Sequence, residues 1–147
     1  MATRGAIGIR NEDGSVTGIY THWDSYVSHN GRILLENYDH TKTRQLLELG
    51  AVSSLGEEIG EKHDFDETYK EGDPRKKWCT FYTRDRGDEM WAAQTYESED
   101  DFFNKMKESW IEYCYLLEEC GTWFVKAYSG SWERVDELLA KEAEEHE

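Results

Sequence analysis

Hydrophobic residues recur with a period of two along parts of the first twenty residues, which is typical of a β-strand with one buried face. The sequence Asn-Glu-Asp-Gly at 11–14 interrupts this pattern, and Gly adopts positive φ in such a turn without steric strain. Residues 5–21 are therefore predicted to form a β-hairpin carrying Ile7, Ile9, Val16, Ile19 and Tyr20. Glycines at positions 5, 8 and 18 predict a bulge or a close approach of another segment to the backbone.

The spacing of apolar residues becomes helical after position 29. Residues 30–38 predict a short helix, and a second helix is predicted to begin at Thr41, as N-cap, and to end at Gly50. The residues expected inside are Ile33, Leu34 and Tyr38 of the first helix, Leu46, Leu47 and Leu49 of the second, and Val52 and Leu55 after it.

The composition changes after position 56. Eight carboxylates and two lysines occupy positions 57–73, which predicts an acidic surface loop at 57–76 containing the only proline, Pro74. Residues 77–83 are rich in aromatic and β-branched side chains and predict a strand. The charged residues 84–88 are expected to form a turn.

The last third of the chain predicts two helices separated by a second hairpin. Ser98, with Asp101 three residues later, predicts the start of the first helix. The hairpin is predicted to have arms at 111–118 and 122–128, and Ser131 is predicted to cap the final helix, which frays into an acidic tail at 141–147. The residues expected inside the two helices are Phe102, Phe103, Met106 and Trp110, then Val135, Leu138 and Leu139.

These elements predict a single α+β domain over residues 1–147. Its antiparallel sheet is expected to contain two hairpins and the strand at 77–83, covered mainly on one face by about four helices. A chain of 147 residues can bury a core without disulfides or metal, and 14% aromatic residues can build that core from large rings. Three cysteines without CxxC spacing predict neither a disulfide framework nor a zinc site.

The charge balance excludes several partners. With 32 acidic and 17 basic residues the formal net charge is -15, which argues against direct nucleic-acid binding and against an anionic membrane face. A basic partner protein, or a surface that imitates a polyanion, is compatible with this charge. Because no signal peptide and no apolar run of about 18 residues is present, a reducing cytoplasm is the expected location.

A first group of candidate site residues follows the first hairpin: Tyr20, His22, Trp23, Asp24 and Tyr26. His22 and Asp24 lie two apart, so an extended backbone would point both to one side. A carboxylate beside an imidazole is an arrangement used in general base catalysis. Binding of a ligand, or a purely structural role in the loop, explains the same residues. His29 and His40 are conceivable additional metal ligands, but no metal-ligand spacing is present and no metal is predicted.

Arg84 and Arg86 form a second group of candidates, because a guanidinium presents a planar fork to carboxylate or phosphate. Together with the aromatic faces of Tyr20, Trp23 and Tyr82 they predict a site for a nucleotide-like ligand. The alternative is that both arginines form ion pairs with the surrounding carboxylates. No Gly-rich phosphate loop is present, so no cofactor is predicted.

Carboxylates form the third group. Twenty-two of the 32 lie in the windows 57–73, 85–101 and 133–147, and convergence of these windows would create a negative patch for a partner. The residues predicted to bind that partner are Glu57, Glu58, Glu61, Asp64, Asp66 and Glu67.

Two motifs carry a resemblance to a known group of proteins. The first is Ile19-Tyr20-x-His22-Trp23-Asp24-x-Tyr26, and the second is Tyr82-x-Arg84-Asp85-Arg86-Gly87. With Leu49-Gly50, Ser53-Ser54-Leu55-Gly56 and Glu112-Tyr113-x-Tyr115-Leu116, the chain resembles a family of small bacteriophage accessory proteins of uncharacterised function. The resemblance implies a viral origin and expression in the cytoplasm of a bacterial host, and it brings no catalytic residues. Position 25 is Ser where those relatives carry Gly, so the loop is expected to be stiffer here.

Three classes of function follow, in order of preference. The first is a phage protein that inhibits a host factor, with a bacterial defence system as the leading candidate, by non-enzymatic binding through its acidic surface. The second is a small-ligand binder that sequesters a nucleotide signal. The third is a small hydrolase that uses His22 and Asp24. The absence of a catalytic signature favours binding over catalysis, and the oligomeric state stays open.

Overall fold

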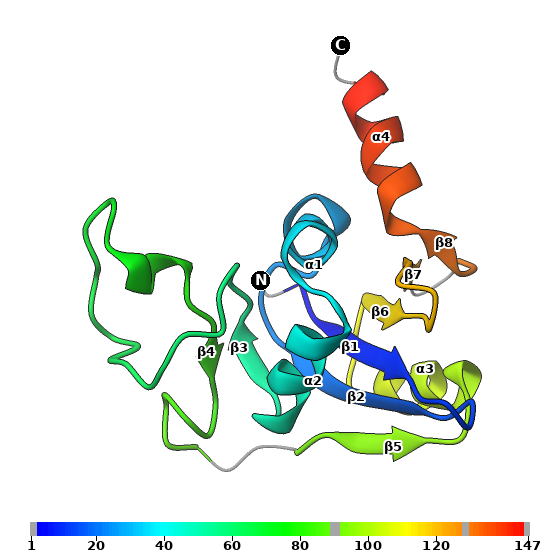
Figure 1. The fold of residues 1–147 in the computed structure, drawn as a ribbon, viewed down its shortest axis with the longest axis horizontal. Coiled ribbons are helices and arrows are strands. Elements are labelled where there is room, and N and C mark those ends of the chain that lie inside the picture. Colours follow the sequence, from blue (N-terminus) through cyan, green and yellow to red (C-terminus); the bar gives the residue numbers. More distant parts are fainter. Residues whose placement is uncertain (1–2, 89–91, 128–129, 146–147) are drawn as a thin grey trace.

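The computed structural model describes residues 3–88, 92–127 and 130–145. Within these residues a mixed sheet of eight strands is surrounded by four α-helices, so the protein has the predicted α+β fold (Figure 1). The strands follow the order β4-β3-β2-β1-β6-β7-β8, and β5 pairs with β2 beside this path. Most neighbouring strands are antiparallel, as predicted, but two pairs are parallel.

Both predicted hairpins are present and form the centre of the sheet. The first consists of β1 (Gly5–Arg10) and β2 (Val16–Thr21), and the second of β6 (Tyr113–Leu117) and β7 (Trp123–Ala127). The hairpins join through β1 and β6, which run parallel to each other. This parallel contact differs from the predicted antiparallel sheet, because pairing between segments so far apart in the sequence leaves no local pattern.

The smaller strands differ from the prediction. β3 (Val52–Ser54) and β5 (Gln94–Tyr96) both pair with β2 and are not predicted, since three residues are too few to show an alternating pattern. The predicted strand at 77–83 is reduced to β4 (Thr80–Phe81), because a 3-10 turn at Pro74–Lys77 precedes it and a turn follows. The two-residue β8 (Glu133–Arg134) completes the sheet beside β7.

The first two helices follow the prediction closely. A π-helical turn at Val27–Gly31 leads into α1 (Arg32–Asn37), and α2 (His40–Glu48) comes next. Asp39 caps α2, because its carboxylate accepts a hydrogen bond from the amide of position 42 at 2.8 Å. The predicted cap Thr41 is therefore wrong: the helix has already begun at position 40, and Asp39 occupies the N-cap position in an extended conformation.

The remaining helices show one confirmed cap and two corrections. α3 (Glu99–Lys107) begins after Ser98, whose Oγ accepts a hydrogen bond from the amide of position 101 at 3.1 Å. Trp110 was predicted on the buried face of this helix; the helix ends before it, and Trp110 is 78% exposed with φ 63°. Because α4 (Val135–Glu145) begins directly after β8, Ser131 does not cap it. α4 also extends into the predicted frayed tail, whose last two residues lie outside the described residues.

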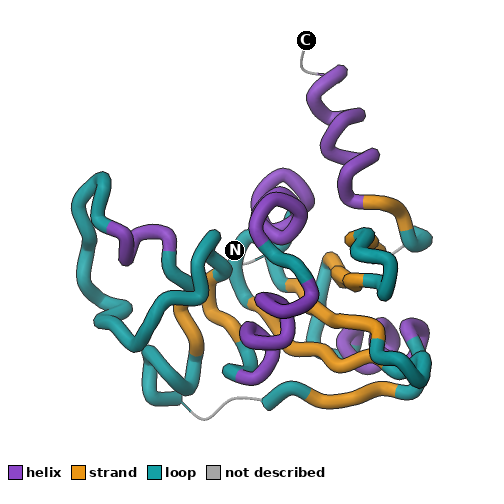
Figure 2. Tube along the Cα trace, in the orientation of Figure 1, coloured by secondary structure: helices purple, strands orange, loops and turns teal. Residues whose placement is uncertain are grey.

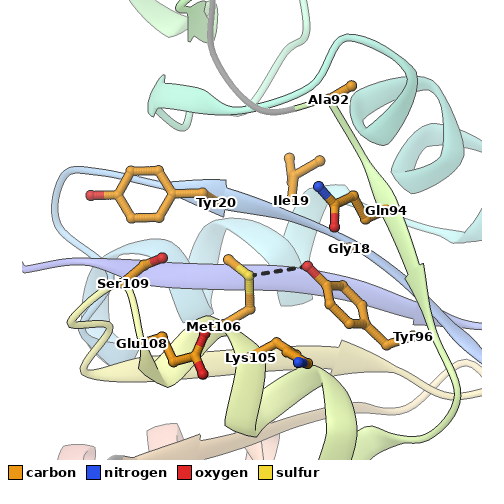
Figure 3. A pocket seen from close by; sticks show the side chains of 10 residues that line it. All are labelled: Gly18, Ile19, Tyr20, Ala92, Gln94, Tyr96, Lys105, Met106, Glu108 and Ser109. Atoms are coloured by element: carbon orange, nitrogen blue, oxygen red, sulfur yellow. Dashed lines mark hydrogen bonds between the residues drawn. The ribbon is translucent and has the colours of Figure 1, made fainter.

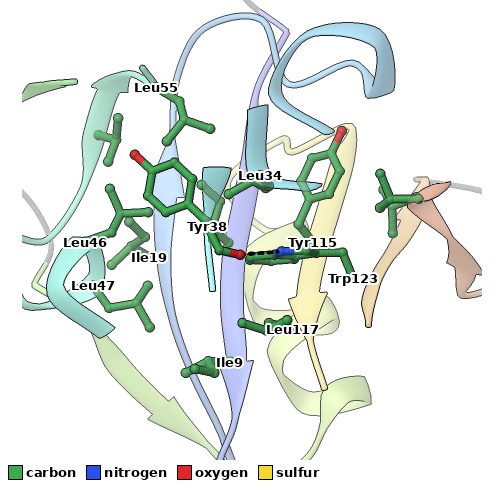
Figure 4. Packing of buried hydrophobic residues seen from close by; sticks show 14 of the residues in the cluster. Ile9, Ile19, Leu34, Tyr38, Leu46, Leu47, Leu55, Tyr115, Leu117 and Trp123 are labelled. Carbon is green, nitrogen blue, oxygen red and sulfur yellow. Dashed lines mark hydrogen bonds between the residues drawn. The ribbon is translucent and has the colours of Figure 1, made fainter. Parts of the chain in front are cut away.

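Hydrophobic residues fill both faces of the sheet. The larger core lies against α1, α2 and α4, and there the Trp123 indole donates a hydrogen bond to the Tyr38 carbonyl at 3.1 Å (Figure 4). The second core lies beneath α3, where the Phe102 ring covers Gly8 and Gly18 of the first hairpin. A Cβ atom on Gly18 would lie 2.3 Å from that ring, which confirms the predicted close approach. Three helices on one face agree with the predicted covering.

The acidic segment at 57–76 is the longest irregular connection in the described chain. Figure 2 shows it as a loop with a single short helical turn, and one isolated bridge between Glu58 and Trp78 ties it to the start of β4. No helix of the described chain is long and apolar enough to cross a membrane.

Candidate functional site

The end of β2 positions the first group of predicted site residues. Beyond Thr21 the backbone stays extended, because the amides of His22 and Trp23 donate to carbonyls of the neighbouring segment at 3.0 and 3.1 Å. Alternation along this extended chain places Tyr20 and His22 on one face. The Tyr20 hydroxyl accordingly lies 2.8 Å from Nδ1 of His22 and the two form a hydrogen bond.

Burial and nearby positive charge keep His22 neutral. Burial contributes most to lowering the pKa of His22, and Arg4 and Arg86 lower it further. Burial also raises the pKa of Tyr20 to about 12, so its hydroxyl keeps the proton. When Tyr20 donates to Nδ1, the neutral imidazole carries its own proton on Nε2. Within the described residues Nε2 has no hydrogen-bond partner, so in this tautomer it can donate to a ligand.

Aromatic rings and Arg86 surround this pair. The Trp23 ring meets His22 edge-on with centroids 4.9 Å apart, and Trp23 is 42% exposed. The Tyr82 ring lies 6.4 Å from His22, and the Arg86 guanidinium lies over Tyr82 at 5.2 Å. We refer to Arg4, Tyr20, His22, Trp23, Tyr82 and Arg86 as the aromatic–arginine site. Of these residues Arg4 is missing from the predicted set, and no sequence signal links it to the others.

Asp24 and Tyr26 are not joined to this site. Asp24 has φ 57°, so the backbone leaves the extended conformation on which the predicted His22–Asp24 arrangement depends. Within the described chain no hydrogen bond joins the Asp24 carboxylate to His22. The Tyr26 ring instead contacts His29 at 5.8 Å.

Two residues that sequence reasoning missed hold this loop in place. The Asn30 side chain is fully buried and donates to the Trp23 carbonyl at 3.0 Å and to Ser25 Oγ at 3.3 Å. The Tyr115 hydroxyl donates to the Ser25 carbonyl at 2.6 Å. Ser25 is thus buried. Hydrogen bonds, rather than a glycine at position 25, determine the conformation of the loop.

Arg84 has a different environment from Arg86. Its guanidinium donates to both carboxylate oxygens of Asp85 at 3.0 Å, and to the carbonyls of Ile59, Gly60 and Cys79 at 3.0–3.1 Å. Asp85 also accepts from the Phe81 amide at 2.8 Å. This buried pair therefore fastens the acidic loop to β4, and Arg84 has no donor directed toward the aromatic–arginine site.

Arg86 lies where the two predicted sites meet. Its Nη1 donates to Ser53 Oγ at 3.4 Å, and its guanidinium lies 4.9 Å from the ring of Phe65, a 40%-exposed residue of the acidic loop. The pairing of Arg86 with Asp88 is long, at 3.4 Å, and half-exposed. Arg86 is therefore available to a ligand in a way that Arg84 is not.

The three acidic windows are spread over the molecule, although Asp85 of the second window lies beside the loop of the first. In Figure 1 the loop at 57–76 lies at one end of the molecule, β5 and α3 lie at the other, and α4 projects separately. Within the loop Glu57 and Glu58 pair with Lys77 and Lys42 at 3.6 and 3.9 Å. The predicted partner-binding residues that have no basic group within 4 Å among the described residues are Glu61, Asp64, Asp66 and Glu67.

A cavity of about 200 Å³ adjoins the site between β2, β5 and the end of α3 (Figure 3). The ring of Tyr20 forms part of its wall, and the hydroxyl of the same residue meets His22. The other side chains around it come from Ile19, Gln94, Tyr96, Lys105, Met106, Glu108 and Ser109. Sequence reasoning missed this cavity because it depends on the unpredicted strand β5.

No group of three or more His, Cys, Asp or Glu residues is arranged to hold a metal ion in the part of the chain that the structure describes. The cysteines are free, and burial raises the pKa of Cys79 and Cys114. In comparisons with known proteins, no family model, no curated protein and no solved structure matches the chain. Its function therefore has to be argued from the site itself.

Proposed function

We propose that the protein binds a small anionic ligand with an aromatic ring, such as a nucleotide, at the aromatic–arginine site and releases it unchanged. The observation that carries this proposal is the position of the Arg86 guanidinium over the Tyr82 ring, beside His22 and the exposed Trp23. Neither Arg4 nor Arg86 has a carboxylate within 3.0 Å among the described residues.

The chemistry of these residues matches such a ligand. The guanidinium groups offer planar pairs of N–H donors to phosphate oxygens, and His22 Nε2 adds one further donor. Trp23 offers a face for stacking, which contributes about 1–3 kcal/mol per base in single-stranded nucleic-acid binding. Trp23 and Tyr82 both lie beside His22 at the end of β2, and Arg86 lies over Tyr82.

Catalysis is less well supported than binding. A histidine general base needs a group that orients its ring and stabilises the imidazolium, and a carboxylate usually provides this. Here Tyr20 occupies that position, while the two arginines oppose protonation of His22. The small-hydrolase alternative that uses His22 with Asp24 therefore lacks its second residue.

The resemblance to phage accessory proteins gives this binding a biological setting. A phage protein made in the bacterial cytoplasm can remove a nucleotide signal from the host simply by holding it. Such sequestration needs tight binding and no turnover.

The experiment is a thermal-shift screen of the purified protein against mono-, di- and cyclic nucleotides. A ligand at a hundred times its Kd stabilises the folded state by about 2.7 kcal/mol. For a chain of this size that raises Tm by about 5–11 °C. Arg86→Ala should abolish the shift, whereas Arg134→Ala, which removes an exposed arginine near α4, should leave it intact. The proposal fails if no nucleotide raises Tm, or if both variants respond like the wild type.

A second candidate function is inhibition of a host protein through the acidic loop, and a specific observation favours it. The Arg84–Asp85 pair holds the loop to β4, and the exposed Phe65 lies between Asp64 and Asp66 in that loop. Such a surface matches a basic partner with an apolar contact at its centre.

This candidate is tested by reversing Glu61, Asp64 and Glu67 to lysine. The triple variant should lose a partner that the wild type captures from bacterial lysate, and the loss should be greatest at low salt. Reversal of Glu133 and Glu137 near α4 is the matched control. Equal capture by the wild type and the triple variant at every salt concentration would count against the loop.

A further inference from the structure

The cavity beside Tyr20 has one wall in common with the aromatic–arginine site. Figure 3 shows the Tyr20 ring at one end, Gln94 and Tyr96 of β5 on the far side, and Met106 of α3 between them. The hydroxyl of the Tyr20 ring forms a hydrogen bond with Nδ1 of His22 at 2.8 Å. A molecule in the cavity therefore lies one tyrosine ring away from His22.

The lining combines flat or polarizable groups with polar ones. Tyr20, Tyr96 and Met106 provide aromatic and thioether surface, while Gln94 and Ser109 provide donors and acceptors. This combination suits a planar heterocycle, whose faces are apolar and whose edge forms hydrogen bonds. A lipid chain would form no hydrogen bonds with these amide and hydroxyl groups.

One polar group in the cavity has only a weak partner. The Tyr96 hydroxyl donates to the Met106 sulfur at 3.6 Å, and a thioether is a poor acceptor. A nitrogen or carbonyl oxygen on the edge of a heterocycle would be a stronger acceptor for this hydroxyl.

The size of the cavity limits what enters. Sites for whole small molecules commonly have about 300–1,000 Å³, and this cavity has about 200 Å³. One ring system fits, and the rest of a nucleotide must remain outside. Arg4 precedes Gly5, which pairs with Thr21 in the β1–β2 ladder, so this arginine lies at the His22 end of β2, beyond the shared wall, where the phosphate of that nucleotide would lie.

We propose that the cavity between β2, β5 and α3 takes the heterocyclic base of the ligand, with the phosphate held by Arg4 and Arg86 beyond Tyr20. This inference rests on the proposed nucleotide binding and adds a base-recognition site to it. In this arrangement the Tyr20 ring lies between the bound base and the bound phosphate.

Gln94→Phe tests the proposal by filling the cavity from the exposed strand β5. The variant is titrated calorimetrically with a nucleotide identified in the thermal-shift screen, with the corresponding nucleoside and with inorganic pyrophosphate. It should lose at least tenfold in affinity for the nucleotide and the nucleoside and keep its affinity for pyrophosphate. Arg86→Ala should lose affinity for the nucleotide and for pyrophosphate and keep its affinity for the nucleoside. Ser109→Leu fills the cavity from another side and should reproduce the effect, while Gln45→Phe, the same exchange on the exposed face of α2, should change nothing.

The outcomes separate the two proposals. Unchanged nucleotide affinity in both cavity-filling variants, with loss in Arg86→Ala, would overturn base binding in the cavity while leaving the proposed function intact. A second outcome is that the wild type binds the nucleoside and Arg86→Ala does not change the affinity for the nucleotide. That outcome would overturn the phosphate site and support binding of the base in the cavity. Absence of any binding by the wild type would overturn both.

Discussion

The buried carboxylate of Asp85 provides the sharpest test of how the acidic loop is held. Its side chain is fully buried and accepts hydrogen bonds from Arg84, from the Phe81 amide at 2.8 Å and from the His63 amide at 3.2 Å. Asp85→Ala removes all of these acceptors at once. The Arg84 guanidinium, 14% exposed, would then keep only backbone carbonyls as partners.

The magnitude follows from these contacts. Loss of one partner of a buried ion pair costs about 3–5 kcal/mol. Because Arg84 keeps three carbonyl acceptors, we expect the lower end of that range. A loss of about 3 kcal/mol lowers Tm by about 6–12 °C in a chain of this length.

Urea titration measures the effect directly, because the midpoint falls while the slope m stays constant if only stability changes. The matched control is Asp88→Ala on the same turn, where the carboxylate is 55% exposed and pairs with Arg86 at 3.4 Å. That change should cost at most about 1 kcal/mol. A loss below about 1 kcal/mol for Asp85→Ala, or unchanged protease resistance of residues 57–73, would refute the anchoring role.

Two further predictions concern His22 and Trp110. The pKa of His22 is lowered from 6.5, chiefly by burial, so the unfolded chain takes up this proton first as the pH falls. The free energy of unfolding should therefore decrease as the pH falls from about 6.5 to the pKa of the folded state. Urea titrations at about pH 7.5 and about pH 5.5 measure this decrease, and His22→Gln should remove the part that His22 contributes. Equal decreases in the wild type and the variant would contradict the prediction. Trp110 is 78% exposed with φ 63°, so Trp110→Gly should relieve about 1 kcal/mol of strain and raise Tm by about 2–4 °C. A lower Tm would mean that the indole ring stabilises the fold.

Local pattern was sufficient to predict the elements that local interactions create. The two hairpins follow from alternation and turn residues, and the Ser98 cap follows from a serine three residues before an acidic residue. The strands β3 and β5 could not be predicted, because each exists only through pairing with β2. The parallel contact of β1 with β6 is non-local in the same way. These pairings form the part of the sheet beside which the aromatic–arginine site and the cavity lie.

The candidate site was likewise predictable only where its residues are neighbours in the sequence. Tyr20, His22 and Trp23 are neighbours in an extended segment, so their proximity needs no tertiary information. Arg84 and Arg86 are two residues apart in a turn, and the sequence gives them equal weight. Only the position of the Asp85 carboxylate and the surrounding carbonyls decides that Arg84 is buried in the fold and Arg86 is not.

For the proposed nucleotide site, the distribution of charge also limits which anions are expected to bind. Arg86 contacts Phe65, and the neighbouring loop residues Asp64 and Asp66 carry negative charge within the same segment. Electrostatic interactions reach about 8–10 Å at physiological salt. In the proposed site a nucleotide with one phosphate group is expected to stay near Arg86, whereas a nucleic acid, with one charge per about 1.7 Å of duplex, would extend toward these carboxylates. We therefore expect the site to prefer a small nucleotide over a polymer, and added salt should weaken that preference because it screens the repulsion.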